Sequence, residues 1–242
     1  MLSGDLQHDR MASLLCYLGA LTIDGATQSG KIQLVIPNLV MRNLYAERII
    51  KMAIPDSGTL RQAQLAADAL FTKGDIEPLC RFIEANHMSI FSNRDYPQFK
   101  ELTLKTLFIT LLYHNHLYVI DSEPELRRGY GDLLMLVRPG KRHYTLVDLL
   151  FEFKQLRLGQ LEKPSISKGN ESDPPTYKGK EIKGMTRTEL MAIPAVRRAL
   201  DEAKEQLGDY VQVLDNKYGD DLRLRSFAVV GVGFERVVWE KI

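Results

Sequence analysis

The sequence predicts a mixed α/β fold, because two kinds of hydrophobic spacing follow each other along the chain. Apolar residues recur at three- and four-residue intervals in several long stretches, as in helices that bury one face. Other stretches are short runs of β-branched and aromatic residues bounded by glycine, proline or charged residues, as in strands. With 242 residues, 45% of them hydrophobic, the chain can build a substantial core.

Helical spacing dominates residues 1–85, which we expect to form a helical N-terminal lobe. Helices are expected over residues 9–21, 38–54 and 59–86, and a short strand pair stopped by Pro37 separates the first two. Asn38 is a suitable N-cap for the second helix. Gly74 breaks the third helix and Asp75 restarts it, because glycine ends helices readily and a carboxylate caps the next one.

The pattern of residues 86–242 predicts a second domain, made of a helix, three strands, another helix and two final strands. The strands are expected over residues 117–121, 131–139, 144–154, 222–234 and 236–242. The first helix is expected from Pro97 to about His116, and the second over residues 188–211 with a restart at Pro194. Residues 159–184 are rich in Pro, Gly, Ser and Lys and predict a mobile insertion. Elements in this order predict a layered mixed sheet.

The charge balance and the cysteine content argue against several classes of protein. The 32 Lys+Arg nearly balance the 31 Asp+Glu, so the whole molecule lacks a basic field for nucleic acid, although a local basic cleft stays compatible with this balance. Cys16 and Cys80 are far apart and lack metal-ligand spacing, which argues against a zinc site or a disulfide framework. No apolar run approaches the roughly 20 residues of a membrane helix, and Asp5 and Asp9 do not suit a signal peptide. We expect an intracellular protein, cytoplasmic or, in a eukaryote, nuclear, without a membrane partner.

An acid and a base, Glu152 and Lys154, stand one residue apart at the end of an apolar strand. Side chains alternate along a strand, so these two share a face, with Cα atoms about 7 Å apart, while Phe151 and Phe153 point to the core. A buried carboxylate and a buried ammonium are costly unless they are paired or bind a metal. Asp132 starts the preceding strand, and antiparallel pairing across residues 140–143 would bring it beside Glu152 and Lys154.

This set of side chains suits hydrolysis of a phosphodiester. Two carboxylates, Asp132 and Glu152, together with the backbone carbonyl of Phe153, provide the hard oxygen ligands that Mg²⁺ or Mn²⁺ prefers. Lys154 would orient the attacking water or stabilise negative charge on the phosphate. The alternative is a structural ion pair at a strand end. Asp148 lies on the same face about 13 Å from Glu152 and is expected to be solvated or salt-bridged.

Asp132, nineteen intervening residues and then Glu152, Phe153 and Lys154 resemble the motif of the PD-(D/E)XK nuclease superfamily, with Gly131 in place of the proline. The resemblance implies a restriction-endonuclease-like mixed-sheet core, in which a hairpin supplies the aspartate and the next strand the other two groups. It implies a metal-dependent nuclease, with DNA as the favoured substrate, Mg²⁺ or Mn²⁺ as cofactor, and Asp132, Glu152 and Lys154 as catalytic residues.

Two further features extend this resemblance. Gln206 and Tyr210 match the QxxxY motif of RecB-like members, in which both side chains face the substrate phosphates. Glu101 matches a glutamate that such members place on their first core helix beside the metal. A second interpretation of Glu101 stays open, since a carboxylate in the first turn of a helix is favoured by the helix dipole.

The N-terminal region resembles the segment between an AAA-type ATPase domain and a C-terminal PD-(D/E)XK domain. No GxxxxGK[ST] phosphate loop occurs in the chain, so an ATPase would have to be a domain or subunit outside it. The chain is then expected to be a fragment or a standalone derivative. The alternative function is a non-catalytic nuclease-fold module, of the effector or toxin type, that binds protein or nucleic acid.

Overall fold

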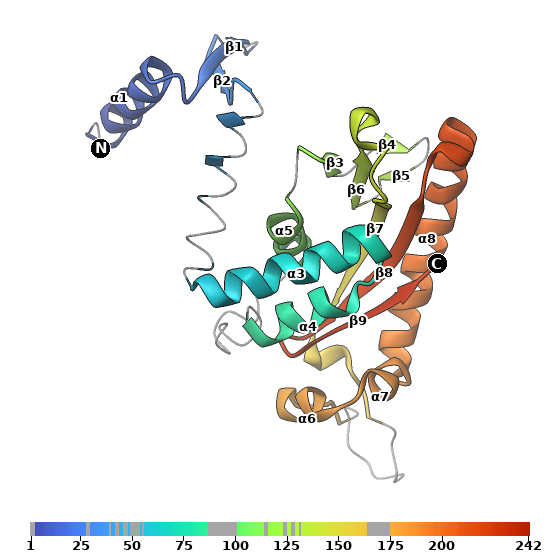
Figure 1. The fold of residues 1–242 in the computed structure, drawn as a ribbon. Coiled ribbons are helices and arrows are strands. Elements are labelled where there is room, and N and C mark those ends of the chain that lie inside the picture. Colours follow the sequence, from blue (N-terminus) through green and yellow to red (C-terminus); the bar gives the residue numbers. More distant parts are fainter. Residues whose placement is uncertain are drawn as a thin grey trace.

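The fold is described by a computed structural model that covers residues 3–27, 30–38, 40–41, 44–45, 48, 54, 56–86, 101–113, 116–122, 125–126, 129–130, 132–163 and 175–242. Its centre is a five-stranded sheet with helices on both faces, which confirms the predicted mixed α/β class (Figure 1). The sheet consists of β3 (Tyr118–Ser122), β6 (Leu133–Val137), β7 (Asp148–Leu156), β8 (Leu224–Val232) and β9 (Arg236–Lys241). The helices around it are α3 (Ser57–Lys73), α4 (Glu77–Asn86), α5 (Glu101–Leu112), α6 (Gly179–Gly184), α7 (Arg187–Met191) and α8 (Pro194–Tyr218).

The strand order in the sheet is β3-β6-β7-β8-β9. The first three strands form an antiparallel meander, and β7 then pairs in parallel with β8. A parallel neighbour requires a long crossover, and the 25-residue helix α8 supplies it. Strand β9 returns antiparallel to β8 and closes the sheet. The five strands of the sheet therefore follow α5 and flank α8 in the predicted order. The short hairpin of β4 (Glu125–Leu126) and β5 (Gly129–Tyr130) and the helix α6 are additions that the sequence analysis does not predict.

Alternating side chains of the central strands fill two hydrophobic layers. Phe151 and Phe153 of β7 pack against α5, where the Phe108 ring lies 5.8 and 5.0 Å from theirs. Leu150 faces the opposite side and belongs to the cluster formed with α8. Helices α3 and α4 belong to the same cluster as Phe151 and Phe153. The hydrophobic core thus extends across residue 85, where the sequence predicts a boundary.

The helix breaks follow local signals. Gly74 adopts the left-handed conformation (φ 66°) that ends α3, and the side chain of Asp75 accepts a hydrogen bond from Glu77 N at the start of α4, as predicted. The predicted end of α5 near His116 is four residues too late. Leu117 O accepts a hydrogen bond from Arg138 N, so the chain is already extended at this point. Pro97, the predicted start, lies outside the described residues.

The N-terminal elements are α1 (Ser3–Tyr17) and a hairpin of β1 (Thr22–Ala26) and β2 (Ile32–Val35), which lie away from the sheet (Figure 1). The predicted helix over residues 9–21 ends earlier, because Gly19 has a positive φ of 70°. The predicted cap is present, since Asn38 Oδ1 accepts from Met41 N at 3.0 Å. None of the described helices is both long and apolar enough to cross a membrane.

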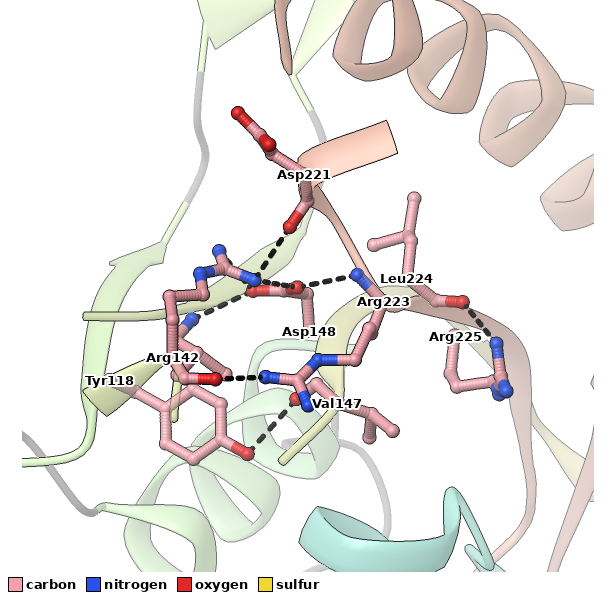
Figure 2. A network of polar contacts seen from close by, with 9 residues as sticks. Tyr118, Arg142, Val147, Asp148, Asp221, Arg223, Leu224 and Arg225 are labelled. Atoms are coloured by element: carbon pink, nitrogen blue, oxygen red, sulfur yellow. Dashed lines mark hydrogen bonds and ion pairs between the residues drawn. The ribbon is translucent and has the colours of Figure 1, made fainter. Parts of the chain in front are cut away.

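Strand β7 begins at Asp148 rather than at residue 144, and the connection from β6 contains the 3₁₀ turn η3 (Pro139–Lys141) instead of a tight hairpin. The cause is a polar network around Asp148 (Figure 2). Its carboxylate accepts two bonds from Arg142, at 2.6 and 2.9 Å, and one each from Val137 N and Arg223 N. The sequence predicts that Asp148 is either solvated or salt-bridged. Because Asp148 is completely buried and pairs with Arg142, the salt-bridged alternative is the one observed.

Both ends of the predicted mobile insertion, residues 159–184, are structured in the described part of the chain, while its mobility stays a prediction. The 3₁₀ turn η4 (Leu158–Gln160) begins it, a bridge joins Glu162 to Thr176, and α6 ends it. Two apolar side chains, Leu161 and Ile182, are fully buried under α8 and fix both ends of the insertion. Residues 164–174 lie outside the described part.

Candidate functional site

The candidate site lies where β6 and β7 separate. Their pairing ends at Leu133 opposite Phe151, which places Asp132, the residue before β6, beside Glu152. Asp132 Oδ2 accepts a hydrogen bond of 2.7 Å from Phe153 N. The Asp132 side chain thus replaces the backbone acceptor that would pair next with β7. It holds together the ends of β6 and β7, which diverge at this point. Because the N–H and C=O of a strand residue point to the same edge, the Phe153 carbonyl lies on the side of Asp132.

Glu152 and Lys154 point from β7 to the face covered by α8. Lys154 Nζ donates to Glu152 Oε1 at 2.9 Å, and the Glu152 residue is only 3% exposed. The other oxygen, Oε2, is buried without a hydrogen-bond partner among the described residues. An unsatisfied buried acceptor costs about 1–3 kcal/mol. The site therefore contains one buried carboxylate oxygen whose acceptor capacity no described residue satisfies.

Helix α5 adds two charged residues to this point. Glu101 is its first residue, and Lys105 follows one turn later. Lys105 Nζ lies 3.8 Å from Asp132 Oδ1, and the two side chains are only 4% and 15% exposed. The sequence analysis missed Lys105. One signal in the sequence could have found it. Lys105 is the single lysine among the apolar residues of "LTLKTLFITLL", and an ammonium buried with such residues requires a charged or polar partner.

The pKa values of these groups reflect their mutual proximity. Burial, opposed by the hydrogen bond from Lys154 and reinforced by the charges of Asp132 and Glu101, raises the pKa of Glu152 from 4.5 to about 7. Burial and the charge of Asp132 also raise the pKa of Glu101, against the effect of the two lysines. Burial by itself lowers the pKa of Lys154, but its bond to Glu152 and the surrounding carboxylates raise it overall.

Helix α8 brings one of the two residues predicted to contact substrate, Tyr210, near the carboxylates. Tyr210 is buried, and its pKa is raised by burial and by the charges of Glu152 and Asp132, so it lies within their electrostatic reach. Gln206, one turn earlier, is exposed to solvent. The structure therefore brings Asp132, Glu152, Lys154, Glu101 and Tyr210 together and leaves Gln206 on the helix surface.

A divalent cation fits the chemistry of this site, but its ligands are not gathered in advance. Among the described residues, no three His, Cys, Asp or Glu side chains form a ready metal cluster. Lys105 and Lys154 instead pair with the carboxylates. The unpartnered Glu152 Oε2, the Asp132 carboxylate and the Phe153 carbonyl are nevertheless the hard oxygen donors that Mg²⁺ or Mn²⁺ selects.

Comparison with known proteins gives no family for this chain. No family model, no curated protein and no solved structure matches it significantly. The resemblance to PD-(D/E)XK nucleases therefore stays a prediction from the residues, and the site itself has to support any function.

The raised pKa of Glu152 predicts how stability depends on pH. Between pH 4.5 and about 7 the folded state binds more protons than the unfolded state, so the free energy of unfolding falls as pH rises through this window. We expect Glu152→Gln to be ~1–2 kcal/mol more stable than wild type at pH 8, after allowance for solvent screening, and nearly equal at pH 4. Urea unfolding at both pH values measures this difference.

The matched control is Glu202→Gln, which changes an exposed glutamate of α8. It should leave stability within about 0.5 kcal/mol of wild type at either pH. A Glu152→Gln variant that is less stable than wild type at pH 8 would show that ionised Glu152 is favourably held, contrary to this expectation.

Proposed function

We propose that this chain is a metal-dependent nuclease with a restriction-endonuclease-like core, and that it hydrolyses phosphodiester bonds, with DNA as the favoured substrate. One observation carries the proposal. A buried carboxylate oxygen, Glu152 Oε2, has no hydrogen-bond partner in the described part of the chain and lies beside a lysine and a second carboxylate at the end of an antiparallel strand pair. A purely structural ion pair would be expected to satisfy both oxygens of a buried glutamate.

The position of the groups supports the same conclusion. The resemblance implies that a hairpin supplies the aspartate and the next strand the acid and lysine. Here β6 and β7 pair antiparallel, with Asp132 before the first and Glu152 and Lys154 in the second. The crossover through α8 then brings Tyr210 to the same place.

The charge balance explains why a cation is needed. Glu101, Asp132 and Glu152 carry three potential negative charges against two positive charges of Lys105 and Lys154. With all five ionised the site repels a phosphate. Asp132, Glu152 and the Phe153 carbonyl, with Glu101 nearby, would hold Mg²⁺ or Mn²⁺, which activates water and neutralises phosphate charge when bound.

The chain's own residues then have separate tasks. Lys154 is 22% exposed along its side chain, so its ammonium can reach a water molecule and orient it or stabilise charge on the phosphate. Tyr210 would donate its hydroxyl to a phosphate oxygen, and Gln206 would contact the substrate from the outer surface of α8. A separate ATPase domain or subunit is a possible partner, and the isolated chain tests whether it is required.

A cleavage assay tests the proposal. We expect the purified chain to cleave supercoiled, linear or single-stranded DNA in Mg²⁺ or Mn²⁺ and to be inactive in EDTA, with RNA as the competing substrate. Asp132→Asn should lower the rate by about 10²-fold or more, because it removes a ligand charge. The amide oxygen of this variant can still accept from Phe153 N, so the strand ends should stay fixed.

Two outcomes would contradict the proposal. Equal cleavage by wild type and Asp132→Asn would assign the activity to a contaminant or to another site. Tight nucleic-acid binding without turnover in either metal would favour the non-catalytic binding module instead.

A further inference from the structure

Lys105 is a buried charge beside the candidate site for which the proposed reaction has no role. We propose that Lys105 acts as an internal counter-cation of the metal site, holding Asp132 in the metal-free protein and weakening the binding of a divalent cation. This inference rests on the proposed function, because it assumes that Asp132 is a metal ligand. It makes Lys105 a positioning residue that regulates metal affinity.

The two oxygens of Asp132 are both engaged in the described structure. Phe153 N donates to Oδ2 at 2.7 Å, and Lys105 Nζ lies 3.8 Å from Oδ1. A cation that uses Asp132 would therefore approach the oxygen that faces the ammonium. Both partners are largely buried, so the repulsion between ammonium and metal is poorly screened by solvent.

Lys105 cannot easily move its charge out of the site. It lies on α5 next to Leu104 and one turn before Phe108, both fully buried, and the residue is only 3% exposed. Lys154 differs, because it is more exposed and pairs with Glu152 Oε1, which leaves Oε2 for a ligand. The positive charge that opposes the metal is thus the one on α5.

The sum of charges gives the direction of the effect. Above the raised pKa of Glu152, the described charges of the site, three ionised carboxylates and two lysines, sum to −1, which a divalent cation changes to +1 and a bound phosphodiester then brings to zero. Without Lys105 the metal-free site carries −2, and the cation alone neutralises it. Lys105 therefore favours metal binding together with the substrate phosphate, and its loss should favour metal binding without substrate.

Calorimetric titration of Mn²⁺ into the full chain tests this inference without any measurement of cleavage. We expect Lys105→Met to bind Mn²⁺ roughly tenfold more tightly than wild type, since a positive charge about 4 Å from a ligand oxygen is removed. Lys105→Arg retains the charge and should bind as wild type does. Adding Glu152→Gln to Lys105→Met should abolish the tight binding, which would locate the ion at this site.

Lys105→Gln is the second variant, in case methionine prevents folding. Its amide can still donate to Asp132 without a charge, and Mn²⁺ should raise its Tm by more than that of wild type. If wild type binds Mn²⁺ while Lys105→Met and Lys105→Gln bind it equally or more weakly, that result would overturn the proposed role of Lys105 and would leave the proposed metal site standing. Absence of Mn²⁺ binding in wild type and variants alike would overturn the proposed metal site together with this inference.

Discussion

Lys154→Met is expected to lower the single-turnover rate constant of DNA cleavage by about 10²- to 10⁴-fold, the usual contribution of a group that positions or exchanges a proton. In the structure Lys154 is the partly exposed partner of a buried glutamate, and its ammonium lies 2.9 Å from Glu152 Oε1. Methionine retains an unbranched apolar side chain of similar length but cannot donate a hydrogen bond. The loss should therefore concern the chemical step rather than folding.

The measurement uses enzyme in excess over a labelled duplex, so that product release does not limit the observed rate. Lys241→Met is the matched control, because Lys241 is exposed at the end of β9 and should tolerate the change with little effect on the rate. Lys154→Met also removes the hydrogen bond to buried Glu152 Oε1, so its free energy of unfolding should fall by about 1–3 kcal/mol, and urea unfolding must show that the variant is folded under the assay conditions. Cleavage within about threefold of wild type would remove Lys154 from the mechanism.

Asp148→Ala should produce the largest loss of stability, about 3–5 kcal/mol, because it breaks a buried ion pair and leaves its partners unsatisfied. Asp148 is completely buried and binds Arg142 through both oxygens (Figure 2). The amides of Val137 and Arg223 also donate to it, so the carboxylate ties β6, β7 and the start of β8 together. Removal leaves a partly buried guanidinium and two backbone donors without this acceptor.

Urea unfolding at pH 7 gives the free-energy difference, provided that the m-value stays unchanged. Asp201→Ala is the control, since Asp201 forms an exposed ion pair with Arg197 on α8 and should cost less than about 1 kcal/mol. Asp148→Asn should lie between the two, because an amide oxygen can accept some of the same bonds. A loss below about 1 kcal/mol for Asp148→Ala would mean that the network contributes little to the fold.

Two carboxylates of β7 differ in how far the described residues satisfy them. Asp148 begins the strand and has every oxygen engaged by guanidinium or backbone donors. Glu152, four residues later, has one buried oxygen that accepts no hydrogen bond from any described residue, and burial raises its pKa to about 7. Stability variants at Asp148 and activity variants at Lys154 should therefore separate cleanly, although both residues belong to one strand.

Some features of the site follow from the sequence because they depend on neighbouring residues. Alternation along β7 places Glu152 and Lys154 on one face and the two phenylalanines on the other. Antiparallel pairing of adjacent strands brings Asp132 to Glu152, since the chain returns within a short connection. The break at Gly74 follows from the conformational freedom of glycine.

The sequence by itself thus determined the mixed α/β class and the order of the strands of the central sheet along the chain. It also determined that Asp132, Glu152 and Lys154 lie close together. Only the tertiary structure showed that Lys105 of α5 reaches Asp132 and that Asp148 is buried among arginines. Only it showed that Tyr210 is buried within the electrostatic reach of Glu152 and Asp132, while Gln206 is exposed to solvent. These contacts join residues distant in sequence, and burial in the assembled layers, rather than any local spacing, decides which charged groups find a partner.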